Sequence, residues 1–446
     1  MRAFQASEGI PSSWCSRQTA LPPNRPYRPP YRPAYRPAAF VVLSGVRQFL
    51  ILSLCLPGLL AAQPPARQTS AGEYTRYELL APETGKFRIL YEVWATTPGA
   101  RYFFNPIRKG SEASDESVRD LATGQPLRFD EVDGATARAS GLPGADTGTR
   151  YIRVELARPV PATGTVRILI DKTYKDPKSY YRENGELVFS RSLGIKRNAV
   201  VLPAGYELIS CNVPSQVLTE PDGRTLVSFI NSFPGAASLV VRARRTPVST
   251  AARQAGAARF TERAAQTREI VYFLRQPETH AFDLYHDYTE AREGADKYLN
   301  VVRAGSTVSN PSAFILDTGQ PLETRFLRGA EITGAGMDIG EAVKPETEVV
   351  VISFPAVKEG QSVRLRISET YTDSARYRIE GGELIWDRAF GRPANAVVLP
   401  AGWYLTRSTV PAGVSLLPDG RVRLDFVNPR QDEIQVLIVA RRRPAP

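Results

Sequence analysis

An internal duplication constrains the fold of this chain more than any other feature. Residues 77–127 align with residues 272–322 at a constant offset of 195, without gaps, and both stretches contain the run Thr-Gly-Gln-Pro-Leu. Farther along, the offset becomes 197, and 173–205 matches 370–402 at 18 of 33 positions. A period this long indicates duplication of a whole domain rather than a short-period solenoid. We therefore expect two copies of one domain, at residues 73–246 and 268–443.

Each copy has the pattern of short β-strands joined by turns. Residues 151–156 and 166–170 alternate apolar and polar side chains and are rich in β-branched residues, which is typical of half-buried strands. Asn184-Gly185 and, in the second copy, Gly381-Gly382 tolerate the positive φ of a type I′ turn, so each predicts a tight hairpin. No long stretch has helical periodicity. The sequence predicts an all-β protein with two tandem, duplicated β-sandwich domains of the immunoglobulin-like type.

The residues before the first copy indicate export. Residues 1–45 are rich in proline, arginine and tyrosine and predict an extended, disordered segment, or an extension that arises from too early a start codon. In 46–62, Arg47 precedes an apolar run that ends in Ala61-Ala62, the pattern of a secretory signal peptide. Residues 63–72 then form a linker. A second linker, 247–267, is rich in alanine and arginine and predicts a short helical or flexible connector.

Two other readings of the apolar segment stay open. Residues 40–62 would be long enough for an uncleaved membrane anchor only if the bilayer tolerated Arg47 and Gln48. A lipoprotein would use Cys55, but the bulky Leu54 stands where a small residue is expected. We expect a secreted or periplasmic protein, with anchoring by residues 40–62 as the alternative.

The net charge of +11 does not predict a nucleic-acid partner. Residues 1–66 contain seven arginines, no lysine and one acid, so they carry +6 and leave only +5 for the remaining 380 residues. In that remainder most basic residues alternate with acids, as in a solvated mixed surface. We therefore expect no nucleic-acid binding.

The chain has too few cysteines and histidines for most catalytic sites. Its three cysteines cannot form a disulfide framework, and the exported part would keep only Cys211, which we expect in a buried strand. The two histidines, His280 and His286, are expected at the surface, although their even spacing on a strand leaves a metal or acid–base role open. No zinc-protease, nucleophile-elbow, phosphate-loop or dinucleotide motif is present. The sequence therefore predicts a protein that is not an enzyme and has no metal or cofactor.

A hydrolase with paired carboxylates is the catalytic alternative. Such an enzyme needs one acid in an apolar pocket beside a second carboxylate. The candidates are acids present in both copies: Asp176 and Asp373, Glu183 and Glu380, and Glu186 and Glu383. Glu183, Glu186 and their equivalents flank the hairpin turns, where we expect exposed, solvated carboxylates.

A set of aromatic and polar residues shared by the two copies suggests a ligand site. Sugar rings stack on aromatic side chains while polar groups hold their hydroxyls, and two linked domains would add avidity on a polymer. The residues are Tyr174, Tyr180, Arg191 and Asn198, with Tyr371, Tyr377, Arg388 and Asn395. The alternative is structural: tyrosine hydroxyls tie corners, arginine stems cover apolar surface and asparagines cap turns.

Residues 203–232 carry a resemblance to a known family. Their proline-led strand, Asp222-Gly223 hairpin and following strand resemble the amino-terminal β-sandwich domain of thermolysin-like zinc aminopeptidases. This family's zinc motif and catalytic domain are missing, so the resemblance implies the fold without the peptidase activity. A second resemblance is to secreted immunoglobulin-like adhesion or carbohydrate-binding modules.

These observations predict an exported, non-catalytic β-sandwich repeat protein that binds a ligand or has a structural role in the cell envelope. Its expected partner is an envelope polysaccharide or a protein, and contact with the membrane is expected only through an uncleaved signal segment. The alternatives are the carboxylate hydrolase and an accessory subunit of a larger peptidase-like partner. Fold-level analogy does not choose among them.

Overall fold

The computed structural model describes residues 67–232, 235–246 and 262–444, and the predicted all-β class is confirmed in them. The helices in this part are short: α1 (Gly134–Ala139), α2 (Ala330–Gly334) and the 3-10 turns η1 (Pro82–Thr84) and η2 (Pro277–Thr279). The segments predicted at 1–45 and 46–62 lie outside the described residues, as do 63–66 of the linker 63–72 and 247–261 of the linker 247–267. The last residues of the first linker, from Ser70, already belong to β1. None of the described helices has the length and apolarity needed to cross a membrane.

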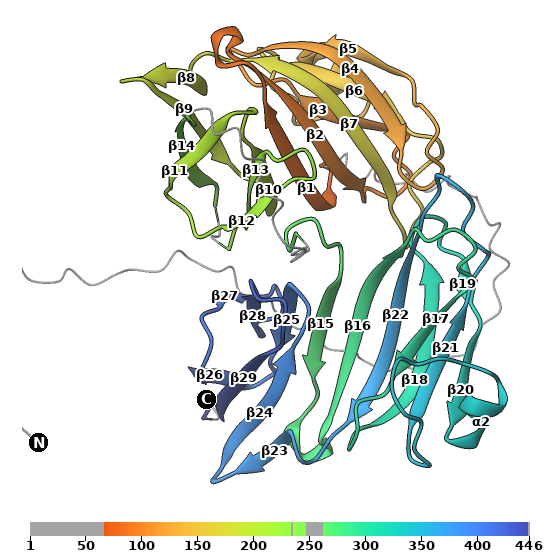
Figure 1. Ribbon diagram of the computed structural model, residues 1–446. Helices are drawn as coiled ribbons and strands as arrows, with labels where there is room; N and C mark the ends of the chain where they lie inside the picture. The colour runs from red at the N-terminus through yellow and green to blue at the C-terminus, as the bar shows by residue number, and fades with distance from the viewer. Residues whose placement is uncertain (1–66, 233–234, 247–261, 445–446) are drawn as a thin grey trace, which may run out of the picture. The chain divides into compact units, whose positions relative to one another are not determined.

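The first repeat, strands β1 to β14, folds into three β-sheets (Figure 1). The large sheet has the order β12 (Gln216–Thr219), β13 (Thr225–Ile230), β10 (Arg197–Val201), β1 (Ser70–Leu79), β2 (Lys86–Ala95), β7 (Val166–Lys175) and β4 (Glu112–Asp120). A four-stranded sheet has the order β11 (Tyr206–Cys211), β14 (Ala237–Arg245), β9 (Glu186–Leu193) and β8 (Tyr180–Glu183). A three-stranded sheet consists of β3 (Tyr102–Pro106), β6 (Arg150–Glu155) and β5 (Phe129–Asp133).

The second repeat, strands β15 to β29, has the same three sheets. Its large sheet has the order β19 (Pro321–Leu322), β18 (Thr307–Ile315), β22 (Val363–Thr372), β16 (Ala281–Glu290), β15 (Glu269–Leu274), β25 (Ala394–Val398), β28 (Val422–Val427) and β27 (Gly413–Leu416). The four-stranded sheet has the order β23 (Tyr377–Glu380), β24 (Glu383–Phe390), β29 (Ile434–Arg442) and β26 (Trp403–Ser408). The three-stranded sheet consists of β17 (Lys297–Val301), β21 (Glu348–Ser353) and β20 (Thr324–Arg328).

The two repeats match strand by strand. The extra short strand β19 corresponds to an isolated bridge between Arg119 and Pro126 in the first repeat. In both repeats one pair of the large sheet is parallel, β1 with β10 and β15 with β25, while the pairs beside it are antiparallel. Because a parallel pair joins strands that are distant in sequence, it links the amino-terminal hairpin of each repeat to its carboxy-terminal half.

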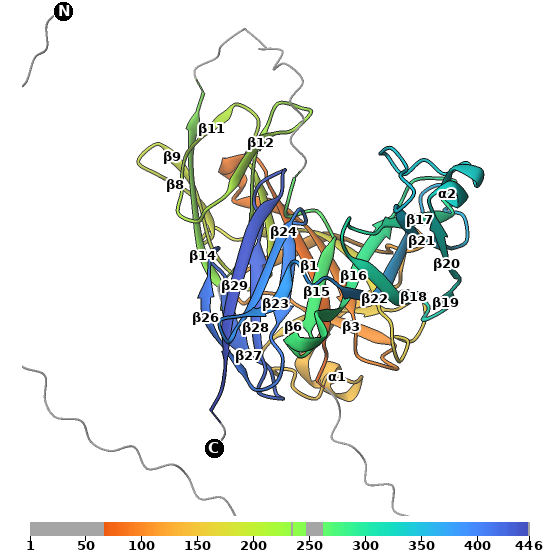
Figure 2. The same ribbon diagram turned by 90° about the horizontal axis from the view of Figure 1, so that it is seen from below.

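Aromatic side chains fill the space between the large sheet and the four-stranded sheet of each repeat. In the first repeat Phe87 has no exposed surface, and its ring centre lies 5.3 Å from that of Phe189. In the second repeat Phe282 is equally buried and lies 6.3 Å from Trp386. Figure 2 shows the four-stranded sheet of the second repeat (blue) from below, beside β15. These cores hold the two sheets of each sandwich together.

The hairpin predictions are confirmed, whereas that for Cys211 is wrong. Asn184 and Gly185 have φ of 50° and 82°, and Gly381 and Gly382 have φ of 58° and 79°, as a type I′ turn requires. Cys211 is half-buried at the end of β11 rather than buried. The register of β11 against β14 shifts just before it, and β11 is the outer strand of its sheet. Cys211 therefore lies on a bulged outer strand, whereas its apolar neighbours in the sequence predicted a buried strand.

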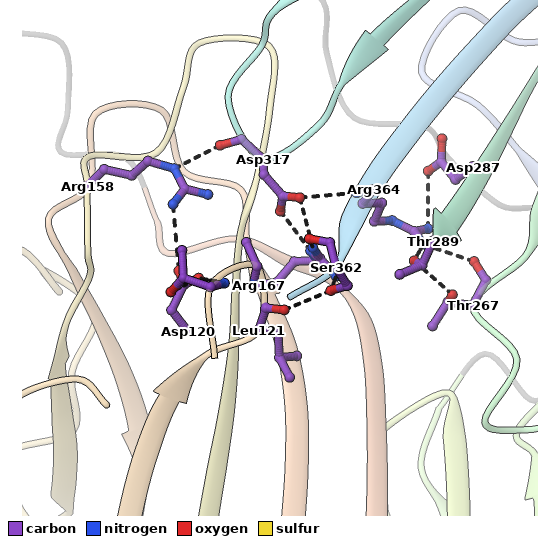
Figure 3. Close-up of polar contacts among 12 residues, drawn as sticks. Asp120, Leu121, Arg158, Arg167, Thr267, Asp287, Thr289, Asp317, Ser362 and Arg364 are labelled. Atoms are coloured by element: carbon purple, nitrogen blue, oxygen red, sulfur yellow. Dashed lines mark hydrogen bonds and ion pairs between the residues drawn. The ribbon is translucent and has the colours of Figure 1, made fainter. Parts of the chain in front are cut away.

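Two equivalent arginines join the repeats in opposite directions (Figure 3). Arg167 on β7 binds Asp317 of the second repeat through Nε–Oδ1 and Nη2–Oδ2 hydrogen bonds of 2.7 and 2.8 Å, and the pair is buried. Arg364 occupies the equivalent position on β22 and is fully buried. Its guanidinium carbon lies 3.7 Å from the ring centre of Trp94 in the first repeat, which is a close cation–π contact.

Contacts to the chain backbone repeat this two-fold pattern. The Thr165 N–H donates to the Leu316 carbonyl at 2.7 Å, and the Ser362 hydroxyl, at the equivalent position, donates to the Leu121 carbonyl at 2.8 Å (Figure 3). Each repeat thus contacts the other through the same surface, as in an isologous dimer interface. The repeats together belong to one compact unit.

Candidate binding cavities

A cavity of the same size lies at the same place in each repeat. The first cavity has a volume of about 370 Å³ and the second about 360 Å³. Each is bounded by residues from all three sheets of its repeat, including β1, β2, β7, β3 and β9 in the first. Eleven lining positions are equivalent, and those with polar side chains in both cavities are Tyr77 and Tyr272, Tyr91 and His286, Asn105 and Asn300, Arg108 and Arg303, Lys172 and Glu369, Tyr174 and Tyr371, and Arg191 and Arg388.

One of these positions carries opposite charges in the two cavities. Lys172 on β7 is 4% exposed, and its Nζ donates a hydrogen bond to Asn105 Oδ1. Glu369 on β22 is 3% exposed, and Asn300 Nδ2 donates to both its carboxylate oxygens at 2.8 Å. Because an amide has an acceptor and a donor end, the same asparagine serves either sign. Neither charged group forms an ion pair within 4.0 Å among the described residues.

Burial dominates the ionisation of both groups. Burial, together with the nearby Arg191 charge, lowers the pKa of Lys172 from 10.5 to about 7. Burial raises the pKa of Glu369 from 4.5 to about 7, although the hydrogen bond from Asn300 opposes this change. A counter-ion beside either group would oppose this effect of burial, and none lies within 4.0 Å among the described residues. Each cavity therefore holds an ionisable group without a counter-ion.

The second cavity also collects polar atoms that have no hydrogen-bond partner. His286 Nε2, Arg388 Nη1 and Asn395 Oδ1 are buried, line this cavity, and have no hydrogen-bond partner among the described residues. Leaving such an atom without a partner costs about 1–3 kcal/mol. Burial, with a contribution from Arg392, lowers the pKa of His286 to about 4, so its imidazole is neutral at pH 7.

A single replacement between the repeats explains why Arg388 has a free donor. In the first repeat Arg191 Nη1 donates to Asp176 Oδ2 at 3.0 Å, beside Ser179. The position of Ser179 is occupied in the second repeat by Arg376, whose Nη1 donates to Asp373 Oδ2 at 3.0 Å. Arg388 Nη1 is then left 3.7 Å from the same oxygen. Because Arg376 occupies the position of Ser179, Arg388 Nη1 keeps a free N–H donor at the cavity.

The eight residues predicted from the sequence are all buried, at 8% exposure or less. Five of them line the cavities: Tyr174 and Arg191 the first, and Tyr371, Arg388 and Asn395 the second. The other three, Tyr180, Tyr377 and Asn198, line neither of these two cavities.

These three residues and Asn395 also have partners within the fold. The hydroxyls of Tyr180 and Tyr377 donate to the Leu80 and Arg275 carbonyls. The side-chain amides of Asn198 and Asn395 donate to the carbonyls of residues three positions earlier, at 2.7 and 2.9 Å. These contacts match the structural alternative, and ligand binding by the eight residues stays a prediction.

The histidine prediction is wrong for His286, which is 6% exposed rather than at the surface. β16 lies between β15 and β22 in the large sheet, and most of its residues on both faces are buried, so it is not the half-buried strand that alternation suggests. His280 is half-buried and caps η2, with a ring nitrogen 2.8 Å from the Tyr377 carbonyl. Among the described residues, no three His, Cys, Asp or Glu side chains are grouped so that they could hold a metal ion.

The carboxylates proposed for hydrolysis have ordinary structural partners. Asp176 accepts hydrogen bonds from Ser179 at 2.7 Å and from Ser111 at 3.1 Å, and these, with the Arg191 charge, lower its pKa against the effect of burial. Asp373 is bound in the same way by Ser306 at 2.8 Å. The acids beside the hairpin turns, Glu183, Glu186, Glu380 and Glu383, are exposed or half-buried.

Sequence reasoning missed Lys172, Glu369 and the role of Asn105 and Asn300. The signal was present, because the gapless alignment of 173–205 with 370–402 is directly preceded by lysine in one copy and glutamate in the other. All eight predicted residues are identical between the two copies, whereas the informative position is one at which the copies differ.

Comparisons with known proteins found solved structures of low similarity to this chain. No protein-family model matches this chain, and no curated protein matches it. An M1 zinc metallopeptidase from Deinococcus radiodurans, bound to a Tyr-Ser-Ala substrate, is 12% identical over 39% of this chain and 41% of its own, with a TM-score of 0.26. An aminopeptidase N family protein from Idiomarina loihiensis is 8% identical over 39% of this chain and 29% of its own (TM-score 0.24). A proposed protease from Parabacteroides distasonis is 11% identical over 83% of this chain and 92% of its own (TM-score 0.24).

Proposed function

We propose that this chain is an exported, non-catalytic binding protein and that the cavity of the second repeat is its ligand site. The export part rests on the signal-like residues 46–62. The binding part rests on one observation: His286 Nε2, Arg388 Nη1 and Asn395 Oδ1 line one cavity without hydrogen-bond partners among the described residues. A ligand in this cavity would supply partners for these buried polar atoms.

The chemistry of these atoms favours a hydroxyl-rich ligand. Arg388 Nη1 donates, Asn395 Oδ1 accepts, and a neutral His286 ring offers one donor and one acceptor. A sugar hydroxyl both donates and accepts, so neighbouring hydroxyls of one ring can serve all three groups. Tyr272 and Tyr371 line the same cavity, so aromatic rings border the proposed sugar. The volume of about 360 Å³ lies in the usual range for small-molecule sites, about 300–1,000 Å³.

Binding can be tested with neutral trisaccharides. Isothermal titration of the purified protein with maltotriose, cellotriose and the trimer of N-acetylglucosamine should identify at least one ligand. His286→Phe keeps a ring in the place of the imidazole but removes the acceptor, and we expect affinity to fall at least tenfold. The matched control is Tyr91→Phe, because Tyr91 is the equivalent residue in the first cavity and its hydroxyl already donates to Glu73 at 3.0 Å.

Three results would contradict the proposal. Equal affinity of the wild type and His286→Phe would remove the second cavity as the site. Appearance of shorter products when the bound trisaccharide is incubated with the protein would show hydrolysis, and Asp176→Ala and Asp373→Ala would then test the carboxylate alternative. Absence of binding by all three sugars, with a correctly folded protein, would count against a neutral glycan ligand.

A further inference from the structure

The first cavity contains a buried amine, Lys172, that forms no ion pair within 4.0 Å among the described residues. The Lys172 side chain lies almost entirely inside the protein, and its only hydrogen bond among the described residues is to Asn105. The carboxylate among the lining residues, Glu73, already accepts from the Tyr91 hydroxyl at 3.0 Å and the Ser70 hydroxyl at 2.7 Å. An ammonium group has three donors, so Lys172 keeps donor capacity toward the cavity.

The second repeat shows that the scaffold does not require a cation at this position. Glu369 stands there with the equivalent asparagine, and the surrounding strands pair in the same order. Burying an unpaired charge is unfavourable whatever its sign. A residue that is costly to bury, and that the fold can exchange for one of opposite charge, points to a role outside the scaffold.

We propose that the first cavity is a carboxylate-binding site in which Lys172 is the counter-ion of an acidic glycan unit, a uronic acid. The Lys172 Nζ lies 4.8 Å from the centre of the Tyr174 ring. A uronic acid carries its carboxylate at the edge of its sugar ring, so a sugar in this cavity can place that carboxylate beside Lys172. Arg108, exposed at the rim of this cavity, adds a second positive charge along the approach. The site is separate from the cavity assigned above.

Trigalacturonate and its methyl ester form a matched pair of probes, because the ester keeps the rings and removes the charges. Isothermal titration of the full chain should show binding of trigalacturonate and at least tenfold weaker binding of the ester. Lys172→Glu introduces the residue type of the second repeat, so the local fold should accept it, and we expect at least a tenfold loss of affinity for trigalacturonate. Lys175→Glu is the control, because Lys175 lies exposed on the same strand.

A measurement on the wild type removes any dependence on variant folding. Reductive methylation followed by mass spectrometry reports the reactivity of each lysine amine, and trigalacturonate should protect Lys172 but not Lys175. Equal affinity for the ester, an unchanged affinity of Lys172→Glu, or unchanged methylation of Lys172 would each overturn the proposal. Binding of a peptide with a free carboxy terminus in place of trigalacturonate would overturn the glycan assignment. His286→Phe should leave trigalacturonate binding unchanged, so this site and the proposed neutral-sugar site can fail separately.

Discussion

The substitution Glu369→Gln should stabilise the protein, and more strongly at high pH. The folded protein keeps a proton on Glu369 up to about pH 7, whereas the unfolded chain loses it near pH 4.5. Between these values the folded state binds more protons, so its stability falls as the pH rises. One pH unit of pKa change is worth about 1.4 kcal/mol, so the buried carboxylate costs about 3 kcal/mol above pH 7 and about 1 kcal/mol at pH 5.

Glutamine removes the charge and keeps the hydrogen bond from Asn300 Nδ2. Urea unfolding curves of both proteins at pH 5, 6, 7 and 8 give the difference in free energy of unfolding at each pH. We expect the advantage of Glu369→Gln to grow by about 2–3 kcal/mol from pH 5 to pH 8. The exposed Glu380→Gln should show no such growth. If the difference in free energy of unfolding between the two proteins stayed constant with pH, the argument would be refuted. The effect of the substitution would then not come from ionisation of Glu369.

Three further predictions concern the interface, the irregular start of β1 and export. Arg167→Ala leaves Asp317 buried without a counter-ion and should cost about 3–5 kcal/mol in urea unfolding, while Arg430→Ala, in an exposed pair, should leave the unfolding midpoint unchanged. Gly72→Ala should cost about 2–5 kcal/mol by the same assay, since Gly72 has φ of 60° and an added Cβ would lie 1.9 Å from the Trp94 ring; an unchanged midpoint would mean that this ring is not fixed. Leu54→Arg interrupts the apolar run and should leave the protein in the cytoplasm on cell fractionation, and continued export would argue against the signal peptide.

The fold could be predicted from the sequence where its determinants are local. Alternating side chains indicate strands such as β6 and β7, and Asn184-Gly185 specifies a turn that only certain residues adopt. Sheet membership is not local in this way. The separation of β3, β5 and β6 into a third sheet depends on pairing between residues 17 to 53 positions apart, for example Tyr102 with Glu155, and no short pattern encodes it.

The candidate site could be predicted only in part, for a related reason. Tyr371, Arg388 and Asn395 were found because they are identical in the two copies, and they do line one cavity. Their free hydrogen-bonding capacity could not be foreseen. Arg388 has a free donor because Arg376 binds the Asp373 carboxylate in its place. His286 was misplaced because its burial comes from both neighbouring strands of the large sheet.

Comparison of the repeats separates residues that hold the scaffold from residues that set specificity. Where both copies keep a buried polar residue, as at Tyr180 and Tyr377, its hydroxyl binds a backbone carbonyl, and either copy would lose a contact on substitution. Lys172 and Glu369 differ in charge, yet both are held only by the equivalent asparagine. A duplicated domain can change such a position without disturbing the contacts that its fold needs. The two cavities should therefore differ in ligand although their scaffolds agree, and binding that was identical in both would contradict this reasoning.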